Sequence, residues 1–457
     1  MGKHLKILFL FFILNSCLIF SQENLFSTTL KRGPAIHFVN SASQPNLVSP
    51  NAITISWWTD DGSDSIVEYG KTTSYEIGKF PGLSKSSFSF TLDQGVGVQH
   101  WVSLTNLQPH TKYYYRIKSN GKNLAPQEEE KGNYYFITPK DQNTTSFTFI
   151  ALGDTADGNP NQEKICETID RYHKDAEFIL ILGDVVYEKS TDPEYGEKYY
   201  PLNYYGRLIR HKPVIPTLGN HEERDGTPDQ QVYRTHHFLP TNGAKTDERT
   251  FYFTYGNGAF FCLDSNLRKE PIYNPSGLHY EWLKKNLNKE DKTWKFVFFH
   301  HPMFGVGTEK TRYCEDETCS QVPCAGQKIC DNNVEWRKEL IPLFIQNKVN
   351  LILTGHDHNY QRTYKVNTYN DESATPFRDE ENGIIHIVSG SGGKYLRNIW
   401  MSPLPDWSAS RNGEIHSFSK IIVKKDVLEF YQYDKNNIIL DSFTLDLKTN
   451  RRTKKQK

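Results

Sequence analysis

The sequence predicts a protein of mixed α/β (α+β) class, with an antiparallel β-sandwich followed by a larger layered α/β domain. Short runs of alternating apolar and polar residues, separated by turn residues, fill 31–140. Apolar strands then alternate with amphipathic helical stretches over 145–447. The chain has 457 residues, of which 37% are apolar, so it can bury more than one core.

The N-terminus has the pattern of an export signal. Lys3, His4 and Lys6 precede an apolar run over 7–13, and small and polar residues follow it. We expect a signal peptide over 1–21, which would make the protein secreted, periplasmic or attached to a cell surface. An uncleaved anchor and a lipidated Cys17 are the alternatives. No other run approaches the roughly 20 apolar residues of a membrane helix.

Charge and cysteine content limit the remaining possibilities. The chain carries 54 basic and 54 acidic residues, which argues against an extended nucleic-acid footprint. A short basic tail over 448–457 is expected to be disordered. The seven cysteines of an exported chain favour disulfides, and Cys166 and Cys262 could equally be buried thiols. Two local bridges of undetermined pairing, or less favourably a zinc knuckle, are expected among Cys314, Cys319, Cys324 and Cys330.

The expected sandwich contains five short alternating runs and no cluster of metal-type ligands. The runs lie at 52–58, 65–69, 100–104, 111–117 and 134–137. The stretch 107–115, Leu-Gln-Pro-His-Thr-Lys-Tyr-Tyr-Tyr, resembles the fibronectin type III pattern, in which a tyrosine near a strand start bonds back to the preceding turn. We interpret this domain as a packing and positioning module.

The second domain is expected to alternate strands and helices. Strands are predicted at 147–152, 178–182, 214–218, 259–263, 295–299, 349–353 and 384–388, and helices at 162–173, 203–210, 279–287 and 334–346. A closing hairpin at 417–423 and 427–433, with a further strand at 438–445, is expected to cap the domain.

Five of these strands are followed directly by metal-type ligands. The segments are Gly153-Asp154, Gly183-Asp184-Val185-Val186-Tyr187, Gly219-Asn220-His221-Glu222, His300-His301 and Gly355-His356-Asp357-His358. Open α/β sheets bind ligands outside the carboxyl ends of their strands, and glycine lets the chain turn sharply there. Each junction alone could be an ordinary polar loop, but five together predict a metal site.

The type and number of ligands indicate two ions. Carboxylates, an amide oxygen, imidazoles and a phenolate make about seven donors, which exceeds the four of a single zinc ion. Paired ions about 3.5–4 Å apart favour a bridging carboxylate and support in-line displacement at phosphorus. The reaction class that the sequence predicts is therefore hydrolysis of phosphate esters.

These five blocks resemble those of the purple acid phosphatases, within the calcineurin-like metallophosphoesterases. The order and spacing match from Phe147 to Arg362, and the preceding sandwich matches the plant-type, high-molecular-weight members. The resemblance implies a four-layer αββα domain. It also implies hydrolysis of phosphate monoesters by a metal-bound hydroxide at Fe(III) plus a divalent Fe, Zn or Mn ion.

The resemblance assigns a role to each donor. Asp184 would bridge the ions, while Tyr187, as a hard phenolate donor, would bind Fe(III) and give the purple colour. The first ion would be completed by Asp154, Tyr187 and His358, and the second by Asn220, His300 and His356.

Further site residues are expected around the donors. His221 would bind phosphate or act as general acid. Tyr360 and Arg362 would support the ligands from behind, and His301 would be either a supporting or a structural residue. Plant members have additional histidines after the fourth block, and this chain has a cysteine-rich segment over 312–330 instead, so Arg312 or Lys310 could contact phosphate. His236 and His237 are expected on the surface.

Three functions are consistent with the sequence. The first is an exported acid phosphomonoesterase of broad specificity that acts on small phosphorylated substrates. The second is a phosphodiesterase or nucleotidase on the same scaffold. The third, a non-catalytic cell-surface binding protein, is disfavoured because the donor set is complete.

Overall fold

The computed structural model describes residues 28–60, 64–86, 97–223, 231–267, 271–307, 334–398 and 400–448. The predicted signal peptide with Cys17, the four clustered cysteines with Lys310 and Arg312, and all but the first residue of the basic tail lie outside these residues. Among the helices of the described ranges, none is both long and apolar enough to cross a membrane.

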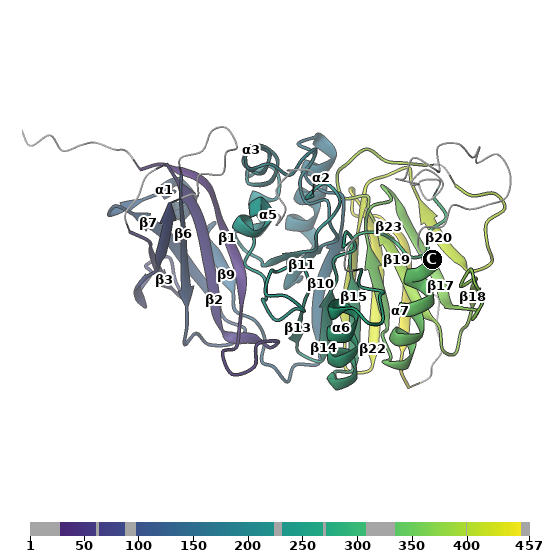
Figure 1. Cartoon of the computed structure of the whole chain (residues 1–457). Helices are drawn as coiled ribbons and strands as arrows, with labels where there is room; N and C mark the ends of the chain where they lie inside the picture. Colours follow the sequence, from purple (N-terminus) through teal and green to yellow (C-terminus); the bar gives the residue numbers. More distant parts are fainter. Residues whose placement is uncertain are drawn as a thin grey trace, which may run out of the picture.

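The N-terminal part is a sandwich of two antiparallel sheets (Figure 1). One sheet has the strand order β1-β2-β6-β5 and the other β4-β3-β7-β8, with β9 beside β7. The strands are β1 (Leu30–Asn40), β2 (Val48–Thr59), β3 (Ile66–Gly70), β4 (Gly78–Pro81), β5 (Leu83–Ser86), β6 (Val98–Leu104), β7 (Lys112–Ser119), β8 (Lys122–Asn123) and β9 (Tyr135–Ile137). The short helix α1 (Pro126–Glu130) precedes β9.

Alternation along the strands builds the sandwich core. In β7, Tyr113, Tyr115 and Ile117 are buried, and they pack with Trp57 of β2 and other apolar residues of both sheets. The Tyr113 hydroxyl accepts the Gln108 N–H at 3.0 Å, which confirms the predicted bond from a strand-start tyrosine to the preceding turn.

A mixed six-stranded sheet begins the second part. Its order is β12-β11-β10-β21-β22-β23, with β10, β11 and β12 parallel and β21 antiparallel to β10. The strands are β10 (Phe147–Leu152), β11 (Phe178–Ile181), β12 (Val214–Pro216), β21 (Ser417–Val423), β22 (Val427–Asp434) and β23 (Ile439–Asp446). The closing strands thus extend the sheet beside β10, so the prediction that they cap the domain was wrong.

An eight-stranded sheet faces the first. Its order is β13-β14-β15-β16-β19-β17-β18, with β20 also paired to β17. The strands are β13 (Phe251–Tyr255), β14 (Gly258–Cys262), β15 (Trp294–Phe298), β16 (Leu351–Thr354), β17 (Tyr360–Thr368), β18 (Pro376–Arg378), β19 (Ile384–Ser389) and β20 (Ser408–Asn412). Strands β14, β15, β16 and β19 are parallel, so their carboxyl ends lie at one edge.

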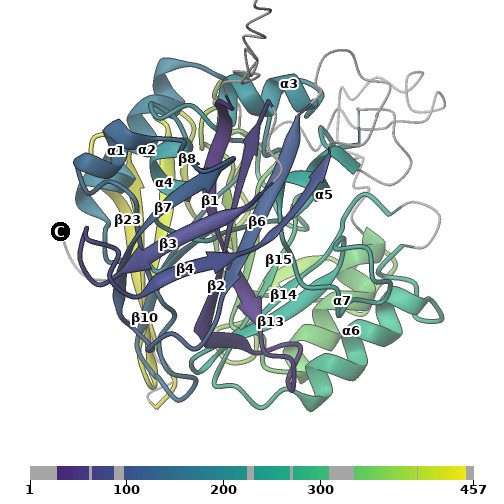
Figure 2. The same cartoon turned by 90° about the vertical axis from the view of Figure 1, so that its left-hand side faces the viewer.

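Helices cover the outer faces of the two sheets. Ile165 and Ile169 of α2 pack in the same core as β10 and β11, while α6 and α7 lie together over the eight-stranded sheet (Figure 2). The helices are α2 (Pro160–Tyr172), α3 (Asp192–Glu194), the π-helical turn η1 (Tyr195–Tyr199), α4 (Gly206–Ile209), α5 (Gln231–His236), α6 (Leu278–Lys289) and α7 (Val334–Gln346). The expected α/β class and four-layer αββα arrangement are therefore confirmed.

Aromatic side chains fill the space between the two sheets. Phe149 of β10 stacks on Phe178 of β11 with ring centroids 5.3 Å apart, and it meets Phe260 and Phe296 of the other sheet edge to face at 5.2 Å. Such pairs add about 0.5–1.5 kcal/mol each beyond the area they bury. The packing fixes the two sheets relative to each other, and with them the strand ends that carry the predicted ligands.

The sandwich shares this core. The ring of Phe38 on β1 lies 5.6 Å from Phe178 and 5.7 Å from Tyr255, and Ala35 and Val48 belong to the same buried cluster. A salt bridge also joins the two parts, because Arg32 Nη2 donates to Asp192 Oδ2 at 2.8 Å.

Several local predictions can be compared directly. The predicted helix at 334–346 and strand at 147–152 have the observed bounds, and Cys166 and Cys262 are buried free thiols. The surface prediction for His236 and His237 was wrong. Both are buried, and His236 stacks on Tyr195 at 4.1 Å in an aromatic cluster that a single sequence does not reveal.

Candidate metal centre

The predicted donors come together where the carboxyl ends of the two sheets meet. β10, β11 and β12 deliver Asp154, Asp184 with Tyr187, and Asn220 from one sheet. The other sheet delivers His300 after β15 and His356 with His358 after β16. The donors thus come from the strand ends of both sheets of the αββα arrangement.

The backbone adopts unusual conformations at this edge. Asp154, Asp184 and His356 have φ values of +59°, +49° and +70°, which are uncommon for residues with a side chain. Gly183 precedes Asp184 at φ +82°, and a Cβ there would lie 2.4 Å from Nδ1 of His300. Such strain is retained where the surrounding structure requires it and is typical of functional sites.

One half of the centre gathers around the Tyr187 hydroxyl. This oxygen lies 2.9 Å from Asp154 Oδ1, 2.7 Å from Asp184 Oδ2 and 3.2 Å from His358 Nε2. The other ring nitrogen of His358, Nδ1, lies 2.9 Å from the Tyr395 carbonyl oxygen, which orients Nε2 toward the hydroxyl.

The other half gathers around Asn220. Its Oδ1 lies 3.2 Å from His300 Nε2 and 3.1 Å from His356 Nδ1, and these two nitrogens are 3.2 Å apart. His300 Nδ1 lies 2.8 Å from the carbonyl oxygen of Leu182. Asp184 joins the two halves, since its Oδ1 is 3.3 Å from His300 Nε2 while its Oδ2 meets Tyr187.

The electrostatics of the donors are strongly coupled. Burial and Asp184 raise the pKa of Asp154 well above its usual range. Burial also acts to raise the pKa of Asp184, but His300 holds it well below its usual range, and Asp184 raises the pKa of His300 to about 9 against the effect of burial. Burial and the two carboxylates raise the pKa of Tyr187 well above its usual value. Without metal ions, the interior therefore favours the protonated forms of Asp154 and Tyr187, and the Asp184 carboxylate is matched by His300.

The donor set fits metal ions. As a ligand, His300 would give up its Nε2 proton on binding a metal ion. With Nδ1 donating to Leu182, the lone pair at Nε2 would then point toward His356 and the Asn220 oxygen, which are themselves metal-type donors. Ligand atoms of Asp154, Asp184 and His300 also lie within 4.8 Å of one another. Oxygen and imidazole donors in this number suit a pair of ions.

His221 lies beside the donors. Its backbone N–H donates to Asp184 Oδ1 at 2.9 Å, and its ring centroid is 4.3 Å from that of Tyr187. Its Nδ1 lies 2.5 Å from the carbonyl oxygen of Glu188, so Nε2 is directed toward the Asp184 side, 3.8 Å from Oδ2.

Glu222 supports the ligand loops from inside. Its carboxylate accepts N–H groups of Asp184, Val185 and Gly219 at 2.7–3.0 Å and the Ser190 hydroxyl at 2.7 Å. Burial and Asp184 raise the pKa of Glu222 to about 7. The sequence block contained Glu222, but nothing in its pattern indicated this role.

Of the remaining predicted residues, one lies next to the donors and two lie away from them. His301 Nδ1 lies 2.7 Å from the Ser265 hydroxyl, and its ring is 4.4 Å from that of His356, so it adjoins the donors. Tyr360 and Arg362 instead reach Asp441 on β23, at 2.8 Å from the hydroxyl and 2.6 Å from Nε. They connect the two sheets and do not contact the donors directly.

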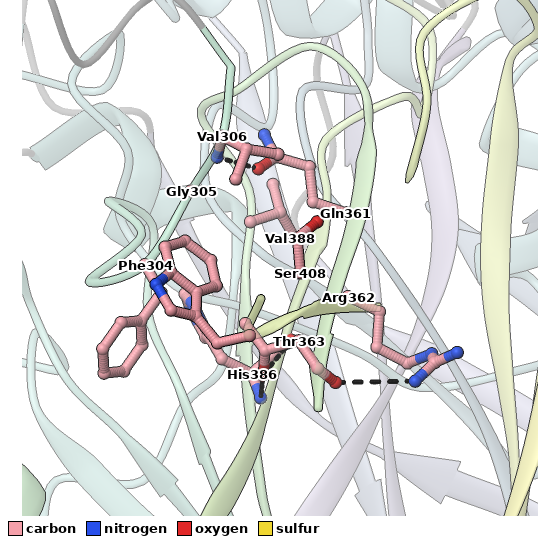
Figure 3. Close-up of a pocket in the computed structure, with 10 residues that line it drawn as sticks. Phe304, Gly305, Val306, Gln361, Arg362, Thr363, His386, Val388 and Ser408 are labelled. Carbon is pink, nitrogen blue, oxygen red and sulfur yellow. Dashed lines mark hydrogen bonds between the residues drawn. The ribbon is translucent and has the colours of Figure 1, made fainter. Parts of the chain in front are cut away.

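A small pocket lies beside the strand that follows the ligand loop (Figure 3). Phe304, Val306, Gln361 and His386 are among its lining residues, and none of the seven predicted donors is. Gln361 accepts the Val306 N–H at 2.6 Å and donates to Asp357 at 2.8 Å. This pocket therefore belongs to the packing that holds the loop between His356 and His358.

A sixth strand end contributes residues that the sequence analysis missed. β19 leads into Gly390–Asn398, where Lys394 Nζ lies 4.4 Å from the Tyr187 ring centroid and donates to Asp157 at 2.8 Å. Arg397 donates its backbone N–H to the His358 carbonyl oxygen at 3.0 Å. The rule applied to the other five strands could have found them, because polar residues directly after a buried strand lie at the carboxyl end of the sheet.

Comparisons with known proteins agree with this geometry. Residues 147–360 match the family model for calcineurin-like phosphoesterases. Residues 42–148 match the purple acid phosphatase N-terminal domain, and 383–442 match the iron/zinc purple acid phosphatase-like protein C model. Fold and site together define a metallophosphoesterase.

Similar proteins narrow the metallophosphoesterase class to one family. The chain is 25% identical to phosphoenolpyruvate phosphatase from Allium cepa, over 84% of this chain and 76% of that one. It is 23% identical to Fe(3+)-Zn(2+) purple acid phosphatase 12 from Arabidopsis thaliana, over 85% and 76%. The chain belongs to the purple acid phosphatase family and is a phosphatase.

Solved structures share the fold. A purple acid phosphatase from yellow lupin (Lupinus luteus) seeds matches with a TM-score of 0.68 at 17% identity, covering 90% of this chain and 74% of that one. PhoD matches with a TM-score of 0.64 at 14% identity, covering 94% and 93%.

Proposed function

We propose that this protein is an exported acid phosphatase that hydrolyses phosphate monoesters at a centre of Fe(III) and a divalent Fe, Zn or Mn ion. The observation that carries the proposal is the Tyr187 hydroxyl, buried within 3.2 Å of Asp154, Asp184 and His358. A phenol in that position is a hard donor suited to Fe(III). The relative named for Fe(3+) and Zn(2+) supports the same pair of ions.

The donors divide into two sets that share Asp184. Asp154, Tyr187 and His358 would hold the iron, and Asn220, His300 and His356 the divalent ion. When bound, the ions supply an acidified water for attack at phosphorus and offset the charge of the phosphate. The packed sheets keep the donors in place before the ions arrive, so little reorganisation is needed on binding.

His221 is placed to handle a proton or the phosphate. Its Nδ1–H donates to the Glu188 carbonyl oxygen, so a proton gained at Nε2 is the one available for transfer. An imidazolium can donate that proton to the leaving alkoxide or to a phosphate oxygen. The relative named a purple acid phosphatase supports an acid phosphatase.

The test uses the purified full-length protein. We expect a visible absorption band from phenolate-to-iron charge transfer, and hydrolysis of p-nitrophenyl phosphate faster than of its bis-ester. Asp184→Asn should lower the rate at least about a hundredfold, because outer partners of a metal site alone contribute 10- to 100-fold. A colourless, active enzyme would contradict the iron assignment, and a faster bis-ester reaction would indicate a diesterase.

Processing of the chain is part of the same proposal. A signal peptide over 1–21 directs export, with lipidation of Cys17 as the alternative, and 31–140 and 145–447 form the two domains. Small phosphorylated compounds, including nucleotides, are the substrates. Intact mass and N-terminal sequencing of the protein recovered from an export-competent host distinguish a Gln22 start from an acylated Cys17.

A further inference from the structure

The segment Gly390–Asn398 lies along the metal centre and is bonded to it repeatedly. The N–H groups of Gly392, Lys394 and Arg397 donate to the carbonyl oxygens of Gly153, Asp154 and His358, at 3.1, 3.0 and 3.0 Å. The last two acceptors belong to predicted ligands. Loop residues held by three such bonds share the precision of the strands they bind.

Arg397 carries its charge beside the donors. The guanidinium bonds the Tyr395 hydroxyl, and the Tyr395 ring centroid lies 4.9 Å from that of His358, so the charge is held near the donors. Burial lowers the pKa of Arg397, while Asp154, Tyr187 and Asp184 act in the opposite direction. The side chain is half-buried, which leaves part of it accessible to a small ligand.

Tyr395 orients this side chain. The Arg397 Nη2 donates to the Tyr395 hydroxyl at 2.8 Å, and the guanidinium carbon lies 5.1 Å from the ring centroid. The Tyr395 carbonyl oxygen also bonds the ring of His358 at 2.9 Å. Because its hydroxyl accepts from Arg397, its own proton can be donated elsewhere, and the ring is exposed at 57%.

We propose that Arg397 binds a terminal oxygen of the substrate phosphate, that Tyr395 positions it, and that this contact favours phosphate monoesters over diesters. The inference rests on the proposed phosphatase function. A monoester presents three terminal oxygens and a diester two. If the rest of the site holds two of them, a donor that takes the third binds a monoester and finds no partner on a diester. The planar guanidinium offers paired donors that match phosphate oxygens, which a lysine does not.

The test compares Arg397→Gln with the wild-type enzyme. A charge-assisted hydrogen bond contributes enough that its loss raises the phosphate Kd and the monoester KM about tenfold. We expect the KM for bis(p-nitrophenyl) phosphate to change less than twofold. Calorimetric titration with inorganic phosphate gives the Kd without turnover, and metal content and the visible band should stay unchanged.

Matched variants separate this contact from general effects. Arg411→Gln removes a charge from an exposed arginine on β20 that lies near Trp400, and it should leave both constants unchanged. Arg397→Lys keeps the charge without the paired donors, so its phosphate Kd should fall between those of the wild type and Arg397→Gln. Tyr395→Phe should raise the Kd by about threefold, because the hydroxyl that accepts from the Arg397 guanidinium and positions it is lost.

Two results would overturn the inference. One is a phosphate Kd within twofold of the wild type in both Arg397 variants, and the other is equal weakening by Arg411→Gln. Failure of the proposed function has a different signature, because the wild-type enzyme itself would then hydrolyse neither ester or would hydrolyse the bis-ester faster than the monoester.

Discussion

Replacing Arg32 by methionine tests how the sandwich supports the loop at Glu188, whose carbonyl oxygen bonds the ring of His221. Arg32 donates from both terminal nitrogens to Asp192, at 2.5 and 2.8 Å, and the two side chains are only 15% and 29% exposed. His236 lies 3.2 Å from the same carboxylate. Methionine keeps most of the apolar stem but leaves Asp192 with His236 alone.

The expected cost is about 3 kcal/mol, since breaking a partly buried ion pair leaves an unmatched charge. For a chain of this size we expect the Tm to fall by about 4 °C. The effect should extend to His221. Asp192 begins α3, whose Glu194 accepts the N–H of Glu188 and Lys189, and the Glu188 carbonyl bonds the His221 ring. A loss of kcat of several-fold should therefore accompany the loss of stability.

Thermal unfolding followed by circular dichroism measures the first effect, and a double-mutant cycle with Asp192→Asn isolates the pair. Lys31→Met is the matched control, because Lys31 makes only an exposed pair with Asp60 at 3.6 Å and should change stability by less than about 0.5 kcal/mol. A coupling energy below about 0.5 kcal/mol for Arg32 and Asp192 would refute the reasoning.

Three further outcomes are expected. His358→Asn should weaken the visible band first, whereas His356→Asn should first lose the divalent ion, as measured by absorbance and metal analysis; equal losses of both ions would contradict the division of donors. Glu222→Gln should lower metal affinity about 10- to 100-fold in a chelator competition, since it places an N–H group among N–H donors; unchanged affinity would contradict its supporting role. Burial acts to raise the pKa of Glu194, but backbone N–H groups lower it to about 2. Its stabilisation is thus present above about pH 4.5 and lost as pH falls toward 2, so the Tm difference between wild type and Glu194→Gln should vanish over that range.

The stability contributed by the salt bridge between Arg32 and Asp192 also depends on pH in the acidic range. Burial would raise the pKa of Asp192, but His236 and Arg32 hold it well below its usual range. A depressed carboxylate pKa contributes stability above the unfolded value of about 4, and this contribution is lost only as the pH falls well below it. The pair therefore stays intact at the mildly acidic pH at which an acid phosphatase works.

The sequence was most informative where a fully buried strand ends in a polar turn. The runs 147–152 and 178–182 are almost entirely apolar because both faces of the strands are covered. The polar residues that follow them are therefore expected at the edge of a sheet. The helix at 334–346 was equally clear from its period and length.

The sequence was least informative where tertiary contacts decide the structure. β17 (Tyr360–Thr368) is rich in polar residues and was not predicted, because its stability comes from pairing with β19 and β20 on both sides. Histidine is a polar residue type, and nothing in the sequence around His236 indicates that it is buried. It is buried because Tyr195, Tyr200 and Asp192 surround it. The strand-end rule could have marked the segment after β19, but the bond from Arg397 to His358 depends on the path of the loop, which the rule does not specify.

Phe38 bears on how the chain folds and how it can be divided. Its ring belongs to the β-sandwich in sequence but to the catalytic core in space, against Phe178 and Tyr255. A catalytic fragment cut near residue 145 would expose those rings to water and would tend to aggregate. The two parts should therefore unfold in one cooperative transition, and exchanging the sandwich between relatives should succeed only if the residues facing Phe38 are exchanged with it.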